Sequence, residues 1–138
     1  MRVLILDANP DWASTLKLML QLEGHDVHLA DSDQLNLNAI AGLMPTVILL
    51  NCNLKSAALR LDTLRALKED RNCRRFPVIL LTTNPTLARQ DLAHARLRGD
   101  FMLAMPFNFS ELVDALKFVT NASLAKGRQQ EIGHAGQT

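Results

Sequence analysis

The chain has 138 residues, 48% of them hydrophobic and 21% charged, with a formal net charge of +1. These values fit one globular domain and exclude a disordered chain. They also give no electrostatic attraction to nucleic acid or an anionic membrane. The two cysteines are too few for a disulfide framework, and no apolar run reaches the about 20 residues that cross a bilayer. An apolar strand begins so close to Met1 that no room is left for a signal peptide, so we expect a cytoplasmic protein.

Short apolar runs alternate with longer segments of helical period, which predicts a parallel sheet covered by helices on both faces. Residues 3–6 are the first strand, apolar throughout as a buried strand should be. Asn9 is a plausible N-cap and Pro10 the first residue of a helix that Gly24 ends. Residues 25–30 alternate polar and apolar side chains, as expected of an edge strand.

The middle of the chain repeats this alternation. We expect a second helix over residues 32–42, a very hydrophobic strand over 47–50 and a third helix over 57–70. The fourth strand spans residues 77–82. After it, Asn84 and Pro85 repeat the cap-and-proline start, and that fourth helix runs to about residue 98.

The last elements complete five strand–helix units. Residues 101–104 are the fifth strand, and Asn108 with Glu111 forms a variant of the capping box that begins the last helix. We place the domain in residues 1–124 and predict a disordered tail over 125–138, which is polar and contains glycine. The predicted fold class is α/β, with a doubly wound five-stranded parallel sheet.

In such sheets the functional site lies at the carboxyl ends of the strands. Four segments stand there: Asp7-Ala8-Asn9, Asn51-Cys52-Asn53, Thr82-Thr83 and Met105-Pro106-Phe107. With their order and spacing, the chain resembles the receiver domains of two-component signalling over about residues 2 to 122. That resemblance implies a flavodoxin-like sheet with strand order 2-1-3-4-5.

The resemblance also implies a role for each strand end. In the family, two adjacent acids after the first strand hold Mg²⁺, and an aspartate after the third becomes phosphorylated. A threonine or serine on the fourth strand and a lysine before the Pro-Phe pair bind the phosphoryl group. Asp7 and Thr82 match this pattern, whereas Ala8, Asn51 and Met105 depart from it.

Each departure has a chemical consequence. The carboxamide of Asn51 is neutral and not nucleophilic, so it cannot form an acyl phosphate. With Ala8 and Asn51 in place of acids, Asp7 is the only anion left, a weak candidate for an ion ligand, and we expect weak or no Mg²⁺ binding and no other cofactor. Met105 offers no charge to a phosphoryl group and should lie over the pocket and exclude water.

More ordinary interpretations of these residues stay open. Asp7 could be only an acid beside the first helix, and Thr82 and Thr83 could bond to the backbone. Trp12 and the phenylalanines are expected in the core, although an exposed phenylalanine on the last strand or helix would mark a partner site. Counting back from Pro106 puts Met102 where the family carries its switch aromatic, with Phe101 beside it.

The primary hypothesis is an atypical, stand-alone receiver, not an enzyme, that binds a signalling protein without phosphorylation. In the family, the face formed by the fourth helix, fifth strand and fifth helix commonly docks partners or makes a homodimer. We expect exposed positions on it at Arg89, Arg96, Phe101 and Lys117. We expect no nucleic-acid or membrane partner.

Two alternatives remain. A phosphorelay receiver could be phosphorylated at an unusual residue, with Asp11 and Asp62 nearby in sequence. A flavodoxin-like small-ligand binder is disfavoured, because the segment after the first strand lacks the glycine of a phosphate-binding loop.

Overall fold

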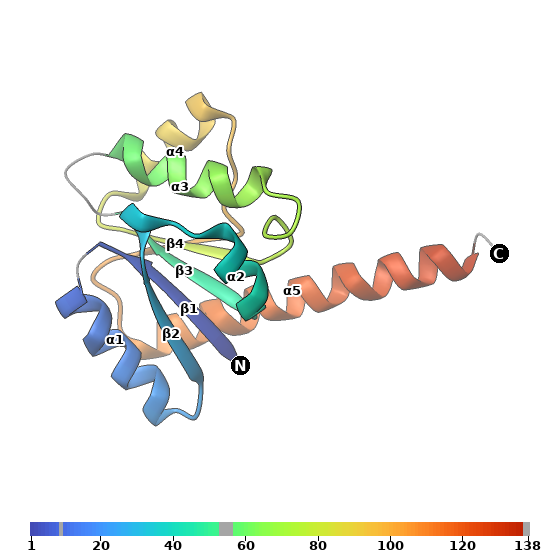
Figure 1. Cartoon of the computed structure of the whole chain (residues 1–138), viewed down its shortest axis with the longest axis horizontal. Coiled ribbons are helices and arrows are strands. Elements are labelled where there is room, and N and C mark those ends of the chain that lie inside the picture. Colours follow the sequence, from blue (N-terminus) through green and yellow to red (C-terminus); the bar gives the residue numbers. More distant parts are fainter. Residues whose placement is uncertain (9, 53–56, 137–138) are drawn as a thin grey trace.

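Five parallel strands form one sheet in the order β2-β1-β3-β4-β5, with helices on both faces (Figure 1). This is a computed structural model, and it describes residues 1–8, 10–52 and 57–136. The strands are β1 (Arg2–Asp7), β2 (Asp26–Asp31), β3 (Val47–Asn51), β4 (Val78–Thr82) and β5 (Phe101–Ala104). The helices are α1 (Pro10–Leu22), η1 (Ser32–Gln34), α2 (Leu37–Leu43), α3 (Ala57–Glu69), α4 (Pro85–Ala95) and α5 (Phe109–Gly136). The predicted fold class and strand order are confirmed.

The sheet separates two apolar clusters because successive side chains of a strand point to opposite faces. In β1, Val3 and Ile5 join the cluster under α1 and α5, and Leu4 and Leu6 join the cluster under α2, α3 and α4. All of β3 and β4 is buried. The continuous apolar runs of these strands therefore follow from burial on both faces.

Side-chain caps begin two of the helices as predicted. The Oδ1 atom of Asn84 accepts a hydrogen bond from the Leu87 amide at 3.1 Å. At the start of α5, Oδ1 of Asn108 accepts from the Glu111 amide at 2.9 Å, and Oε1 of Glu111 accepts from the Asn108 amide at 3.3 Å. These reciprocal bonds are a capping box. Asn9, the cap predicted for α1, lies outside the described residues.

The prediction of one helix over residues 32–42 was wrong. The segment is divided into the short η1 and the helix α2, with Asn36 between them. Oδ1 of Asp31 accepts from the Asp33 amide at 2.8 Å, and Oδ1 of Asn36 accepts from the Ala39 amide at 3.0 Å. Short polar side chains that bond to nearby amides compete with a continuous helix and start a new one.

Two helices also end away from their predicted limits. The fourth helix ends at Ala95 and not near residue 98, because Arg96 takes a left-handed conformation with φ 55° and caps it. The helix α5 continues to Gly136, through the segment for which we expected a disordered tail, and passes beyond the edge of the sheet (Figure 1). The domain boundary at residue 124 stays a prediction.

Two residues just before β5, Gly99 and Asp100, lie close to other parts of the fold. A Cβ atom at Gly99 would lie 2.8 Å from Cδ1 of Leu80, so a larger residue there would require the Leu80 side chain to shift. The next residue, Asp100, pairs with Lys68 of α3, with 2.9 Å between Oδ2 and Nζ. The same Oδ2 accepts from the Val78 amide at 2.7 Å, so this carboxylate ties together α3, β4 and β5.

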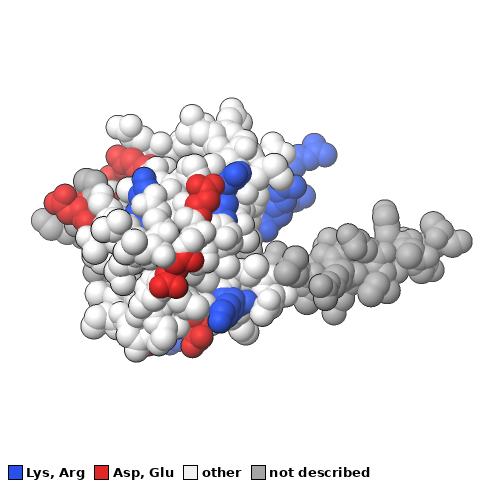
Figure 2. Space-filling view, turned by 90° about the horizontal axis from the view of Figure 1, so that it is seen from below, with Lys and Arg blue, Asp and Glu red and all other residues white. Residues whose placement is uncertain are grey.

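The surface shows no broad region of one charge on the face in Figure 2, where acidic and basic side chains are interspersed among neutral ones. This mixture agrees with the net charge of +1. In the part of the chain that the structure describes, none of the helices has the length and apolar character needed to span a membrane.

Candidate functional site

The sheet brings the predicted pocket residues together at the carboxyl ends of its central strands. Asp7 ends β1, Asn51 ends β3 and Thr82 ends β4, and these strands are neighbours in the sheet. All three side chains are buried, with residual exposures of 6%, 7% and 4%. Ala8 is half-buried after β1, and Met105 is half-buried after β5. Asp7 and Asn51 are therefore in contact, whereas Met105 and Asn51 line one cavity and Asp7 and Ala8 line another beside β2.

Asp7 and Asn51 are joined by a hydrogen bond across the sheet. Nδ2 of Asn51 donates to Oδ2 of Asp7 at 3.0 Å. A buried carboxylate needs a cation or good donors to offset its lost hydration. Here an amide N–H approaches Asp7 from the position where the receiver pattern has the aspartate that becomes phosphorylated. The amide thus replaces a like-charge repulsion with an attraction.

Thr82 is a backbone-bonding residue, as the more ordinary interpretation held. Its Oγ1 accepts from the Asn84 amide at 3.1 Å, which holds the turn between β4 and α4. The neighbouring Thr83 is exposed and faces the cavity described next. Thr83, directly after β4, is therefore the residue of this turn that a molecule in the cavity would meet.

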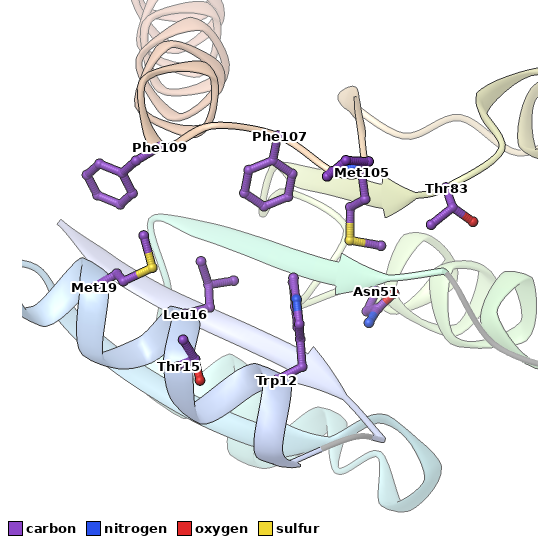
Figure 3. Close-up of a pocket in the computed structure, with 10 residues that line it drawn as sticks. Trp12, Thr15, Leu16, Met19, Asn51, Thr83, Met105, Phe107 and Phe109 are labelled. Atoms are coloured by element: carbon purple, nitrogen blue, oxygen red, sulfur yellow. The ribbon is translucent and has the colours of Figure 1, made fainter.

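Met105 lies beside a cavity of about 500 Å³ between α1 and the loop from β5 to α5 (Figure 3). The peptide bond to Pro106 is cis, and Pro106 also lines the cavity. Asn51 and Thr83 lie at one end of it, and Met19 with Phe109 lies at the other. The site is thus more apolar than a phosphoryl pocket, and sequence reasoning missed this. The signal was the spacing of Trp12, Leu16 and Met19 on one side of α1, of which we had expected Trp12 in the core.

The residues present do not fit a tightly bound Mg²⁺. This ion favours six oxygen ligands with at least one or two carboxylates, whereas the strand ends offer Asp7, whose Oδ2 already accepts from an amide. Asp31 ends the neighbouring β2 opposite Asp7, and its own Oδ1 accepts from the Asp33 amide. Within the described residues there is no group of three or more His, Cys, Asp or Glu placed to hold a metal ion.

The alternative phosphorylation candidates lie away from these strand ends. Asp11 is an exposed residue in the first turn of α1, and Asp62 is exposed on α3. The cavity includes neither of them among its lining residues, whereas it includes Asn51. The structure therefore groups Asn51 and Met105, but not Asp11 or Asp62, around the site.

The elements α4, β5 and α5 carry exposed basic side chains and an aromatic pair. Arg89, Arg96 and Lys117 are exposed, as expected. Phe101 is half-buried and not exposed, because it packs against the cluster under α1 and α5. The exposed aromatic residue is Phe118, at 58%, whose ring centroid lies 5.4 Å from that of Phe101. This exposed ring is the feature that we had named as the mark of a partner site.

The two candidates for the switch position on β5 face opposite ways. Phe101 packs on the α5 side of the sheet, and Met102 packs with the cluster under α3 and α4. Neither side chain is fully exposed. Met102, which the count back from Pro106 places at the predicted switch position, thus packs against the sheet's other layer.

The ionisable groups with a clear shift lie outside this site. Burial and the N-terminal ammonium group lower the pKa of His25, whose Nδ1 lies 3.3 Å from that nitrogen. Burial raises the pKa of the Cys73 thiol, which donates to the carbonyl of Leu37. A buried thiol with a raised pKa is a poor nucleophile, so Cys73 is a packing residue.

Sequence comparison assigns no family: no known family model and no curated protein matches this chain. Solved structures do match in fold. The receiver domain of the sensor histidine kinase PA1611 from Pseudomonas aeruginosa PAO1 is 24% identical, with 87% of this chain and 97% of that one covered and a TM-score of 0.70.

Two further structures give the same result. The chemotaxis protein CheY4 of Vibrio cholerae is 22% identical over 86% of this chain and 97% of its own, with a TM-score of 0.72. NtrX of Brucella abortus is 21% identical over 95% of this chain but only 29% of its own, with a TM-score of 0.77. At these identities the likeness establishes the receiver fold alone.

Proposed function

We propose that this chain is an atypical receiver module of a two-component signalling pathway that acts in the cytoplasm through protein contacts, without being phosphorylated. The observation that supports this most directly is the bond between Asn51 and Asp7, 3.0 Å long and buried. The carboxamide occupies the phosphoacceptor position and its N–H group is used to hold Asp7. The pocket is consistent with a static polar contact and not with a reactive centre.

Phosphoryl transfer needs a nucleophile and positive charge around the transferred group. Asn51 is no nucleophile, and Met105, at the position of the family's lysine, supplies no charge. Lys68 pairs with Asp100, and this ion pair lies at the amino ends of β4 and β5, away from the strand-end pocket. We therefore assign this chain no phosphotransfer step and no enzymatic activity.

Protein binding is the function left to the scaffold. The rings of Phe101 and Phe118 form an aromatic pair whose outer member is 58% exposed, on a face that also carries Lys117, Arg89 and Arg96. Aromatic and arginine side chains contribute most to protein interfaces. This face suits a protein partner with an apolar spot bordered by acidic groups, or a second copy of the chain.

The phosphorylation claim is tested with a small-molecule phosphodonor such as acetyl phosphate plus Mg²⁺, followed by intact-mass spectrometry. We expect no phosphoryl adduct on the natural chain. The matched control is the triple variant Ala8→Asp/Asn51→Asp/Met105→Lys, which restores the family's residues and should gain an adduct. An adduct on the natural chain that Asn51→Ala removes would contradict the proposal, and one that maps to Asp11 or Asp62 would favour the alternative receiver.

The interface is tested with Phe118→Ser. We expect this variant to lose a partner that co-purifies with the natural chain, or to lose its concentration-dependent dimerisation in sedimentation measurements. Leu22→Ser is the control, since Leu22 is even more exposed, at 79%, but lies on α1. Equal behaviour of the two variants would rule out this face as the partner site.

A further inference from the structure

The cavity beside Met105 is large enough for a small organic molecule. Its volume of about 500 Å³ lies within the range of about 300–1,000 Å³ that is typical of ligand pockets. Its mouth is at the surface, because Thr15 and Thr83 on its rim are exposed and Met19 is partly exposed. A molecule could therefore enter without unfolding any part of the sheet.

The chemistry of the lining restricts what would bind. Trp12 of α1 lies across the cavity from Met105, with Phe107 and Phe109 farther along the same wall (Figure 3). Aromatic rings and thioethers attract flat π systems through stacking and sulfur–aromatic contacts. The described residues that line the cavity include no acid, lysine, arginine or histidine. An ionised ligand would lose part of its hydration there without gaining a partner of opposite charge from these described residues.

Two polar side chains of the lining stand together at one end, whereas the hydroxyl of Thr15 on α1 donates to the carbonyl of Asp11. There Asn51 and Thr83 approach the cavity from the ends of β3 and β4 (Figure 3). A few polar groups at one end of an apolar pocket fix the orientation of a ligand, as is usual in small-molecule sites. The best occupant is therefore long enough to reach from Met19 to Asn51 and carries its hydrogen-bonding group at one edge.

We propose that the cavity between α1 and the β5–α5 loop binds an uncharged, flat aromatic small molecule that places a polar group beside Asn51 and Thr83 and its rings between Trp12 and Phe107. This is a separate site from the α4-β5-α5 face. It does not depend on whether the chain is phosphorylated or which protein it contacts, so the two proposals fail independently.

The test uses 2-naphthol as the probe and 2-naphthoate as its charged match of similar size. Binding is followed by the methyl NMR signals of the methionines. Met19 and Met105 line the cavity, while Met44 caps α2 on the opposite side of the sheet and serves as the internal control. We expect saturable shifts at Met19 and Met105, none at Met44, and affinity at least about tenfold weaker for 2-naphthoate.

The site is verified with a variant that fills the cavity from the surface. Thr15→Phe places a ring in the opening and should abolish the saturable shifts, and because Thr15 is exposed the change should leave the fold intact. Leu18→Phe is the matched control on the outer face of α1, where the same ring stays in solvent. Unfolding of either variant is checked by circular dichroism.

Trp12 gives a second readout, since it is the only tryptophan in the chain. Its fluorescence should change with the same saturation curve as the methyl signals, and it reports binding even if Thr15→Phe fails to fold. The proposal is overturned by absence of saturable shifts, by equal shifts at Met44, by equal affinity for the two probes, or by full binding in folded Thr15→Phe.

Discussion

The two ends of the sheet hold an aspartate in different ways. At the amino ends of β4 and β5, Asp100 is paired with the ammonium group of Lys68, and the same oxygen accepts from the Val78 amide. At the carboxyl ends, Asp7 accepts from the neutral carboxamide of Asn51. The side chains of the first pair are 32% and 22% exposed, whereas Asp7 and Asn51 are nearly inaccessible.

The difference separates an aspartate that is paired with a lysine near the surface from a buried aspartate that is held by a neutral amide. Near the surface a lysine can pair with an acid while keeping part of its hydration, which lowers the cost of desolvation. In the deeper strand-end pocket, burying a charged side chain without a metal ion costs more desolvation free energy. A neutral donor such as the Asn51 amide avoids the repulsion that a second acid beside Asp7 would cause. The buried carboxylate at the carboxyl end is therefore stabilised by a neutral amide donor.

The largest expected effect is that of Asn51→Asp, which puts a second carboxylate 3.0 Å from Asp7. We expect the free energy of unfolding at pH 7 to fall by about 3 kcal/mol, since two buried like charges repel without a cation. Repulsion raises the pKa of one carboxyl in the folded variant above its unfolded value. The loss is thus greatest above that folded pKa and shrinks as pH falls toward 4, which urea unfolding across pH can measure.

Asn84→Asp is the control for that substitution. Asn84 caps α4 at the surface, where aspartate is as good a cap as asparagine, so we expect a change within about 0.5 kcal/mol. If Asn51→Asp were as stable as the natural chain at pH 7, the carboxamide would not be the group that offsets Asp7.

A smaller loss is expected at the other end of the sheet. Asp100→Ala removes the acceptor of the Val78 amide and the partner of Lys68, so we expect a loss of about 2 kcal/mol in urea unfolding. Amide exchange at Val78 should also become faster. Asp26→Ala is the matched control, because its pair with Arg2 has the same distance of 2.9 Å but is far more exposed. Equal losses in the two variants would contradict a structural role for Asp100.

The smallest expected effect on stability comes from the titration of His25, which lies beside the N-terminal ammonium group. Burial first and that charge second lower its pKa, so its contribution to stability is complete above the unfolded pKa and is lost as pH falls through the folded one. NMR titration should place its pKa below the usual value. Extending the chain before Met1 should raise it, and an unchanged pKa in the extended chain would exclude the ammonium group as a cause.

Local patterns determined most of the fold. Apolar runs of strand length and helical stripes repeat within a few residues, so they predicted all five strands. The order of the sheet was predicted from the resemblance to receiver domains. The caps at Asn84 and Asn108 were equally local. The break between η1 and α2 was missed because polar side chains around Asn36 bond to amides in a way that hydrophobic periodicity does not record.

The sequence by itself also determined which side chains stand at the strand ends, and so the loss of the acceptor, the second acid and the lysine. Only the tertiary structure decided that Asn51 donates to Asp7, that Phe118 is exposed where Phe101 is not, and that a cavity opens beside Met105. The physical reason is distance along the chain. Asp7 and Asn51 are separated by 44 residues, and the cavity depends on how far α1 packs from the β5–α5 loop, which no local period contains.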